Sequence, residues 1–211
     1  MIAALYVQTG GAYFGLPNVD PWDIHRDART YAGPWPVVAH PPCERWSKCA
    51  HIHGRIGEDD GCFGSALVAV ETWGGVLEHP AGSEAWRRYG IPTPAESTKG
   101  WFRTIRGGWT CLVDQGNYGH RSRKLTWLYW CGHGAPTPLI WGTSDKPALV
   151  QKSLGKKERS RTPLPFRDVL IGLATLSAIY QIHREAMAER LPDPCHHASS
   201  VTRRCAECEV A

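Results

Sequence analysis

The sequence predicts an α/β fold built around a central sheet. Short apolar segments with the character of strands alternate with segments of helical periodicity, as expected for sheet proteins that carry helices. The composition is that of a globular protein, with 42% hydrophobic and 21% charged residues. A chain of 211 residues is long enough to bury one core and short enough to form one domain.

Five segments have the length and composition of strands, because each is a short apolar run bounded by glycine, proline or polar residues. The last two are joined by a short glycine-containing link, which favours antiparallel pairing. Pro80 is expected to end the third strand, since proline cannot donate to a ladder. The five segments are Ala3 to Val7, Pro36 to His40, Gly74 to His79, Trp109 to Gln115 and Lys124 to Gly132.

Three segments read as helices. Phe63 to Trp73 has apolar positions that fit a packed helix, and a short helix is expected between a cap at Ser83 and a stop at Gly90. Phe166 to Leu191 approximates a 3.6-residue period, which predicts a long amphipathic helix docked on the sheet. We therefore expect one domain over 1–191, with 136–165 as a surface excursion, followed by a Cys/His-rich tail over 192–211.

Composition and hydropathy also indicate where the protein is located in the cell and which classes of partner it can bind. No apolar run reaches the roughly 18 residues of a membrane span, and the N-terminus lacks the pattern of a signal peptide, so we expect a cytoplasmic protein. Eight cysteines in such a protein indicate reduced thiols, ligands or a catalytic thiol. The net charge of +4 is compatible with a polyanionic partner. The basic run 152–161 is either a solvated loop or a phosphate contact.

Two strand ends carry reactive side chains. The strand in "PVVAHPPC" breaks at two prolines and places Cys43 on the loop that follows, and "VLEHPAG" places Glu78 at the end of another strand. Open α/β sheets bind ligands at the edge where the carboxyl ends of their strands lie. A thiolate and a carboxylic acid in one pocket can attack an electron-poor ring and hydrogen-bond its ring nitrogen. A buried structural thiol and a simple ion pair are the alternatives for Cys43 and Glu78.

Four segments together resemble the cytosine-C5 DNA methyltransferase family, in the order found there. "HPPCERWS" resembles its Pro-Cys loop, and "VLEHPAG" resembles its Glu-Asn-Val strand end, with His79 and Pro80 in place of Asn and Val. "ALYVQTGGAYFGL" is similar to its cofactor loop, and "YGHRSRK" to a shortened form of its Arg-x-Arg segment. The resemblance covers roughly 3–129 and implies a reduced, Rossmann-like class I methyltransferase-type sheet with a long C-terminal helix, as in a compact, phage-type relative.

The resemblance implies a mechanism and a cofactor. Cys43 would add to C6 of a cytosine, Glu78 would hold N3 and the exocyclic amine, and Arg121 or Arg123 would steady the base or its phosphate. The partner would be DNA, with the target base flipped or single-stranded. The methyl donor would be S-adenosylmethionine. Its implied contacts are Tyr6, Gly10, Gly11 and Pro41, with Asp20, Asp23 or Asp27 on the ribose.

The chain also departs from that family, which leaves other functions open. Gln8 stands where an early glycine is expected, the interval before the Pro-Cys strand is short, and no segment has the size of a target-recognition domain. A noncatalytic nucleic-acid-binding module and a pyrimidine-modifying enzyme with another donor or a free nucleotide are the alternatives. For catalysis the thiol pKa of Cys43 should be lowered by Arg45, Lys48 and a following helix. Trp46 and Trp127 are candidates for stacking on a base.

Two Cys/His clusters suggest metal. The tail offers Cys195, His197, Cys205 and Cys208, a set that suits tetrahedral zinc, although a disordered tail has the same composition. A second cluster around Cys43 superficially resembles a zinc deaminase site but lacks the His-x-Glu and Cys-x-x-Cys elements of that signature. Its members are His40, Cys43, Cys49, His51 and His53.

Overall fold

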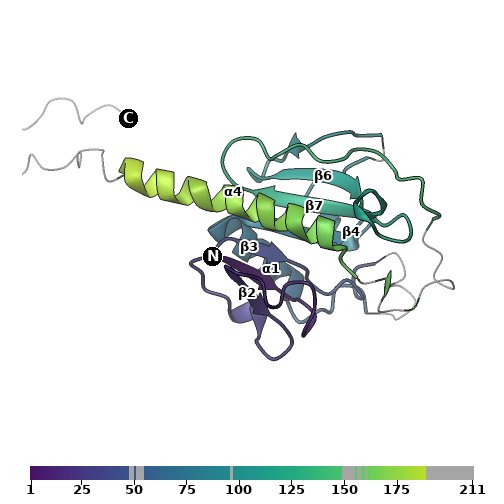
Figure 1. Ribbon diagram of the computed structural model, residues 1–211, viewed down its shortest axis with the longest axis horizontal. Coiled ribbons are helices and arrows are strands. Elements are labelled where there is room, and N and C mark those ends of the chain that lie inside the picture. The colour runs from purple at the N-terminus through teal and green to yellow at the C-terminus, as the bar shows by residue number, and fades with distance from the viewer. Residues whose placement is uncertain are drawn as a thin grey trace, which may run out of the picture. The chain divides into compact units, whose positions relative to one another are not determined.

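The computed structural model describes residues 1–47, 50, 55–95, 97–148, 155, 158–159 and 161–188. Within them, seven strands form one sheet in the order β2-β1-β3-β4-β7-β6-β5 (Figure 1). The strands are β1 (Ile2–Leu5), β2 (Val19–Trp22), β3 (Val37–Ala39), β4 (Gly75–Pro80), β5 (Phe102–Arg103), β6 (Trp109–Asp114) and β7 (Leu125–Cys131). The prediction of a mixed α/β protein with a long C-terminal helix is confirmed.

The sheet is parallel on one side and antiparallel on the other. Strands β2, β1, β3 and β4 run parallel, whereas β7 is antiparallel to β4, β6 to β7 and β5 to β6. The five predicted strands are all present. Strand β4 ends at Pro80, as expected, and Pro80 is itself the last paired residue, opposite Thr126. Two strands were missed, because β5 has only two residues and β2 contains Pro21, which an edge strand tolerates.

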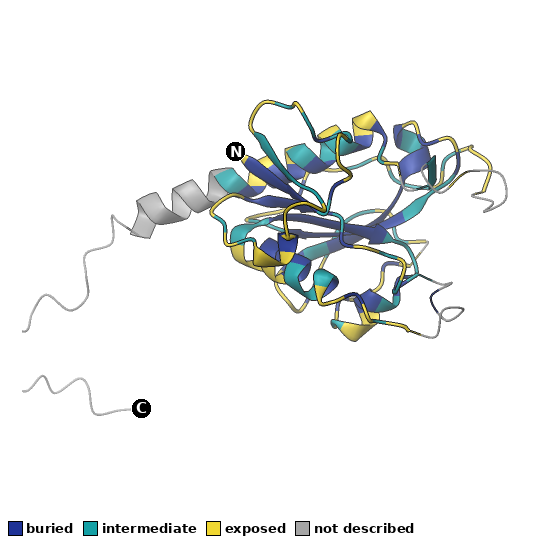
Figure 2. Ribbon diagram, turned by 90° about the horizontal axis from the view of Figure 1, so that it is seen from below, coloured by how far each residue is buried: buried dark blue, intermediate teal, exposed yellow. Residues whose placement is uncertain are grey.

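Helices cover both faces of the sheet (Figure 2). Helix α1 (Cys62–Trp73) and the short α2 (Glu84–Arg88) pack on one face, and α4 (Leu164–Ala188) packs on the other. Alternate strand residues divide between the two cores, as the two-residue period of a strand requires. Leu77 of β4, for example, lies in the α1 core, and Val76 before it lies in the α4 core.

Side-chain hydrogen bonds fix α4 on the sheet. The Trp130 indole Nε1 of β7 donates to the Leu173 carbonyl at 2.9 Å, and the Ser177 hydroxyl donates to the Cys131 carbonyl at 2.8 Å. The chain divides into two compact units, 1–180 and 181–211, and of the second unit the structure describes only the helical residues 181–188. The sequence had placed this boundary after residue 191.

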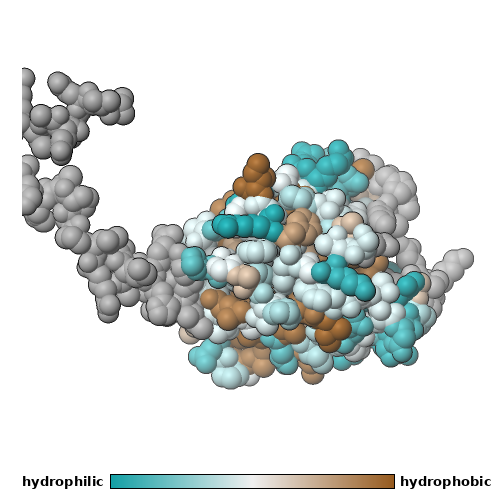
Figure 3. Space-filling view, turned by 90° about the horizontal axis from the view of Figure 1, so that it is seen from above, coloured by the Kyte–Doolittle hydropathy of each residue, from teal (hydrophilic) through white to brown (hydrophobic). Residues whose placement is uncertain are grey.

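The segment 136–148, expected to be a surface excursion, is irregular but attached to the core unit. Leu139 and Trp141 pack against the α4 core, and both the backbone N–H and the hydroxyl of Ser144 donate to Asp114 Oδ2 at 2.9 Å. In the view of Figure 3, hydrophobic side chains occur in small groups among hydrophilic ones. No helix in the described part of the chain combines the length and apolar character that a membrane span needs.

Candidate functional site

A cleft lies at the edge of the sheet where the parallel strands β1, β3 and β4 end. The chain leaves β1 for β2 on one side and returns to β3 on the other, which makes the β1/β3 junction a topological switch point. Ligands bind open α/β sheets outside the carboxyl ends of the strands at this point. The cleft has a volume of about 1790 Å³, larger than the roughly 300–1,000 Å³ of a typical small-molecule site.

Cys43 reaches the cleft from the loop after β3. It is half-buried and carries a free thiol. The backbone N–H groups of Trp46 and Ser47 donate to its carbonyl at 3.0 and 2.9 Å, so the loop forms a tight turn behind the thiol.

The expectation that the Cys43 thiol is activated is wrong for the protein alone. Burial raises its pKa, the negative charge of Glu78 raises it further, and Lys124 opposes this. Residues 44–47, directly after Cys43, form a turn, and Lys48 lies outside the described residues. Trp46 cannot stack on a base: it is fully buried and its indole donates to Asp59.

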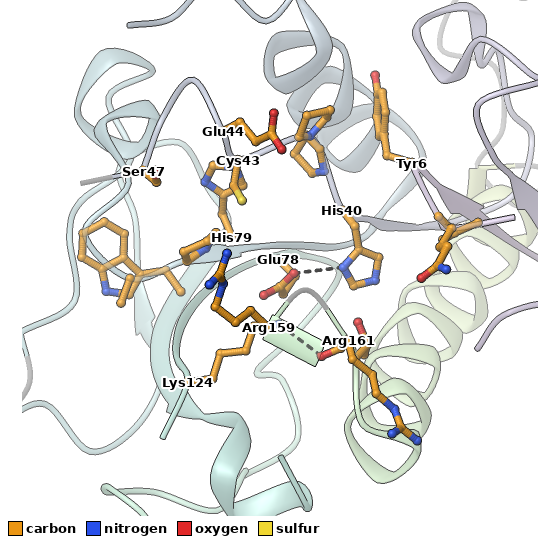
Figure 4. A pocket seen from close by; sticks show the side chains of 18 of the residues that line it. Tyr6, His40, Cys43, Glu44, Ser47, Glu78, His79, Lys124, Arg159 and Arg161 are labelled. Atoms are coloured by element: carbon orange, nitrogen blue, oxygen red, sulfur yellow. Dashed lines mark hydrogen bonds and ion pairs between the residues drawn. The ribbon is translucent and has the colours of Figure 1, made fainter. Parts of the chain in front are cut away.

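Glu78, at the end of β4, faces the same cleft as Cys43 (Figure 4). It is 8% exposed, and each carboxylate oxygen accepts a hydrogen bond: Oε2 from His40 Nδ1 at 2.9 Å and Oε1 from Gln115 Nε2 at 3.0 Å. Burial alone would raise the pKa of Glu78, but the His40 hydrogen bond and the charge of Lys124 outweigh it and lower that pKa to about 2. Glu78 is therefore ionised at neutral pH.

Two histidines flank this carboxylate. His40 is held on its other side by the Tyr13 hydroxyl, 2.8 Å from Nε2. His79 is fully buried and stacks on Trp86, with ring centroids 6.1 Å apart. Burial lowers the pKa of His79 to about 4, against the opposing charge of Glu78. His79 is therefore neutral at pH 7.

The side of the cleft across from Cys43 is basic. Figure 4 shows Lys124, Arg159 and Arg161 on this side. Lys124 Nζ donates to the Arg161 carbonyl at 3.3 Å, which ties the basic segment to the start of β7. Of the two arginines predicted to hold the base, Arg123 lines the cleft, whereas Arg121 is exposed and lies outside it.

The residues expected to bind the cofactor are only partly brought together. Tyr6, Gly10, Gly11 and Pro41 line the cleft around the end of β1. The remaining three, Asp20, Asp23 and Asp27, do not.

All three aspartates have partners of their own. Asp27 caps the short 3-10 helix Ala28–Thr30 and pairs with Arg29 at 2.8 Å. Asp20 lies within β2, pairs with Arg26 at 2.6 Å and accepts from the Trp22 indole. Asp23 directly follows β2 and accepts a hydrogen bond from the Thr9 hydroxyl at 2.7 Å. It therefore lies at the same edge of the sheet as the cleft, because β2 runs parallel to β1.

The proposed zinc ligands of the tail, Cys195, His197, Cys205 and Cys208, lie outside the described residues. So do Cys49, His51 and His53 of the second cluster. In the part of the chain that the structure describes, no three His, Cys, Asp or Glu side chains are grouped closely enough to hold a metal ion.

With this geometry in place, the chain can be compared with known proteins. No protein-family model matches it, and no curated protein is similar to it.

The structure adds three residues to the site that the sequence had not assigned to it: Tyr13, Gln115 and Lys124. It also places His40, which the sequence grouped with Cys43 only as a possible metal ligand, against Glu78. His40 had the same signal as Cys43, since it ends the same strand directly before the two prolines. Gln115 and Lys124 adjoin β6 and β7, and no pattern in the sequence indicates that β7 pairs with β4.

Proposed function

We propose that this protein modifies cytosine in DNA by the chemistry of the cytosine-C5 methyltransferases. The observation that carries the proposal is the placement of Cys43 and Glu78 at the ends of two neighbouring parallel strands, facing one cleft at the switch point of the sheet. The parallel half, β2-β1-β3-β4, is also what supports a Rossmann-like assignment, because it has the reversal of strand order found in doubly wound sheets.

Cys43 is the nucleophile in this proposal. Its sulfur forms a bond to C6 as the C5–C6 double bond is lost, and the thiol proton goes to ring N3, which leaves an enamine that is nucleophilic at C5. Once C5 is substituted, loss of the C5 proton and departure of the Cys43 sulfur from C6 restore the ring. Because burial raises the pKa of the thiol, the free enzyme keeps it protonated. Attack therefore requires that the thiol proton be transferred once the substrate is bound, and Glu78, which lines the same cleft, is the carboxylate that can relay it to the ring.

Glu78 holds the base. As a buried carboxylate it accepts hydrogen bonds and donates none, so it can accept from the exocyclic amine of cytosine. The contact to N3 that the resemblance implies forms only when a proton lies between the two groups, because both are acceptors. The basic wall formed by Arg123, Lys124, Arg159 and Arg161 suits the phosphates on either side of the base. A cleft of about 1790 Å³ has room for a nucleotide together with a second ligand.

The loop after β1 fits a bound cofactor. A Cβ at Gly10 would meet no atom within 4 Å, so its backbone can be approached closely, and Gly11 is required because a Cβ there would lie 2.7 Å from the Gln8 carbonyl oxygen. S-adenosylmethionine bound here would supply the methyl group. The residues that would hold it are Tyr6, Gly10, Gly11 and Pro41. Asp23 directly follows β2, the strand after the glycine loop, and so corresponds in position to the carboxylate that binds the ribose in dinucleotide-binding sheets.

The test is mass spectrometry of total nucleosides from a bacterial host without cytosine methylation that expresses the protein. We expect 5-methylcytosine or another new pyrimidine in cells with the wild type, and its loss with Cys43→Ala. Cys62→Ala is the matched control, because Cys62 is also a half-buried free thiol but does not line the cleft. If the soluble, folded wild type produces no new base, the proposal is wrong.

A noncatalytic nucleic-acid-binding module is the second candidate, favoured by the raised pKa of Cys43. In that case single-stranded DNA should bind with an affinity that falls steeply with salt, Cys43→Ala should bind as well as the wild type, and no new base should form. A new pyrimidine confined to the nucleotide pool would instead indicate an enzyme that acts on free nucleotides.

A further inference from the structure

The cleft continues past Glu78 to the other face of the sheet. Glu78 of β4 pairs with Leu128 of β7, whereas Trp127 pairs with His79, the next residue of β4. Directly paired residues project to the same face and successive residues to opposite faces, so Glu78 and Trp127 lie on opposite faces of the sheet. Trp127 packs in the α1 core, and yet both residues line the same cleft. The cleft therefore extends across the edge of the sheet.

The part of the cleft at Trp127 is apolar. Leu112 of β6 pairs with Trp127, and Leu125 lies two residues before Trp127 in β7, so the three side chains share one face. All three line the cleft, and we call them the Trp127 floor. Leu112 and Trp127 are 7% and 8% exposed, and Leu125 is half-buried. A firmly packed apolar surface of this kind suits the flat ring of a nucleobase.

Positive charge lies at the edge between the two faces. Arg123 and Lys124 directly precede β7, and both line the cleft. The charge of Lys124 reaches Glu78, whose pKa it lowers, and Figure 4 shows Lys124 on the side of the cleft across from Cys43. Because Arg123 and Lys124 adjoin Leu125, they also lie next to the Trp127 floor. A phosphate that links a nucleotide on one face to a nucleotide on the other would meet these two cations.

We propose that the cleft binds single-stranded DNA across the edge of the sheet, with the target base at Glu78 and the base of a neighbouring nucleotide on the Trp127 floor. The phosphate between the two nucleotides lies at Arg123 and Lys124. The inference rests on the proposed function to the extent that the base at Glu78 is the one that is modified.

The arrangement of the two base positions favours a single strand over a duplex. Neighbouring bases of a duplex are stacked, and an enzyme that flips one base takes only that base out of the stack. Here the edge of the sheet would lie between the two bases, so both must be unstacked and unpaired. Unpairing costs free energy for each base, and a strand that is already single avoids this cost.

The size of the cleft agrees with more than one nucleotide. Its volume of about 1790 Å³ exceeds the roughly 300–1,000 Å³ of a typical small-molecule site. A mononucleotide has one base and can occupy one face only. The Trp127 floor offers apolar contact, which every base can accept through its ring face, so the neighbouring nucleotide should be bound with little preference for its base.

The test measures the affinity of the full chain for dCMP and for the dinucleotides pdCpdT and pdTpdC by titration calorimetry. The two dinucleotides place the neighbouring base on either side of the cytosine. We expect one of them to bind roughly five- to hundredfold more tightly than dCMP, the range that contact of one base with an aromatic side chain contributes. An oligonucleotide that contains this dinucleotide should bind more tightly as a single strand than as a duplex at the same salt concentration.

Two variants connect this advantage to the Trp127 floor. Trp127→Leu should reduce the advantage of the tighter dinucleotide to less than about threefold and leave the affinity for dCMP within about twofold of the wild type. Trp109→Leu is its matched control, because Trp109 is a half-buried tryptophan of the same sheet that does not line the cleft. Leu125→Ala should reduce the advantage in the same direction, with Leu139→Ala, at a half-buried leucine outside the cleft, as the control.

A measurement on the wild type covers the case in which Trp127→Leu does not fold. The Nε1–H resonance of Trp127, assigned by its absence from the spectrum of Trp127→Phe, should shift when the tighter dinucleotide binds and stay in place with dCMP. A resonance that does not respond to the dinucleotide would overturn the inference.

The affinities can also overturn it. Binding of none of these ligands, equal affinity for dCMP and both dinucleotides, tighter binding of the duplex, or an undiminished advantage in Trp127→Leu would each do so. If the Trp127-dependent advantage is present while cells contain no modified base, the proposed reaction fails and the inference stands. If a modified base forms and neither dinucleotide binds more tightly than dCMP, the inference fails and the proposed reaction stands.

Discussion

Asp59 is the buried residue that holds the Cys43 loop against helix α1, and its replacement by alanine gives the sharpest test of the fold. Its Oδ2 accepts hydrogen bonds from the Trp46 indole at 2.8 Å and from the Phe63 backbone N–H at 2.7 Å. Asp59 is 8% exposed and Trp46 and Phe63 are fully buried, so water cannot replace the acceptor. The backbone N–H of Trp46 donates to the Cys43 carbonyl at 3.0 Å and so closes the turn behind Cys43.

The magnitude follows from the two donors that lose their partner. Each buried donor left unsatisfied costs about 1–3 kcal/mol, and hydrogen bonds to a charged acceptor lie at the upper end. Asp59→Ala should therefore lower the free energy of unfolding by about 3–5 kcal/mol, a large share of the total of about 5–15 kcal/mol for a typical domain.

The assay is equilibrium unfolding in urea, followed by tryptophan fluorescence and by circular dichroism. Glu58→Ala is the matched control, because this neighbouring carboxylate is exposed and pairs only loosely with Arg55 at 3.8 Å, so we expect a change within about 0.5 kcal/mol. A loss of less than about 1 kcal/mol in Asp59→Ala would show that the Trp46 and Phe63 donors find other partners, and would refute the reasoning.

Two further predictions concern a glycine and a histidine. Gly75→Ala should abolish folding as judged by circular dichroism, because φ at Gly75 is +117° and the new Cβ would overlap the Val37 carbonyl in the neighbouring strand. Gly172→Ala, on an open face of α4, is the control and should raise the free energy of unfolding by about 0.5–1 kcal/mol. Because the folded pKa of His79, about 4, is below its unfolded value, its contribution to stability is complete above about pH 6.5 and is lost as the pH falls toward 4. His79→Gln should therefore lose less stability than wild type between pH 7 and about pH 4.5 in urea titrations, and an identical loss in the two proteins would contradict this assignment.

Local sequence patterns were enough to locate most elements of the fold. Apolar runs bounded by glycine or proline located five of the seven strands, and the helical period located α1 and α4, because these signals depend on residues that are neighbours in the chain. The same local signal indicated that Cys43 and Glu78 follow strands. Strands β2 and β5 lacked it, since one contains Pro21 and the other has only two residues.

The sequence by itself therefore determined the fold class and put Cys43 and Glu78 at strand ends, where short-range chemistry is sufficient. Tertiary structure alone decided that β7 pairs with β4, which brings Gln115 and Lys124 to Glu78. It also decided that the thiol of Cys43 is held protonated and that Trp46 is a core residue. The physical reason is that pKa values and burial depend on distances between groups that are far apart in the chain, and these exist only once the sheet has assembled.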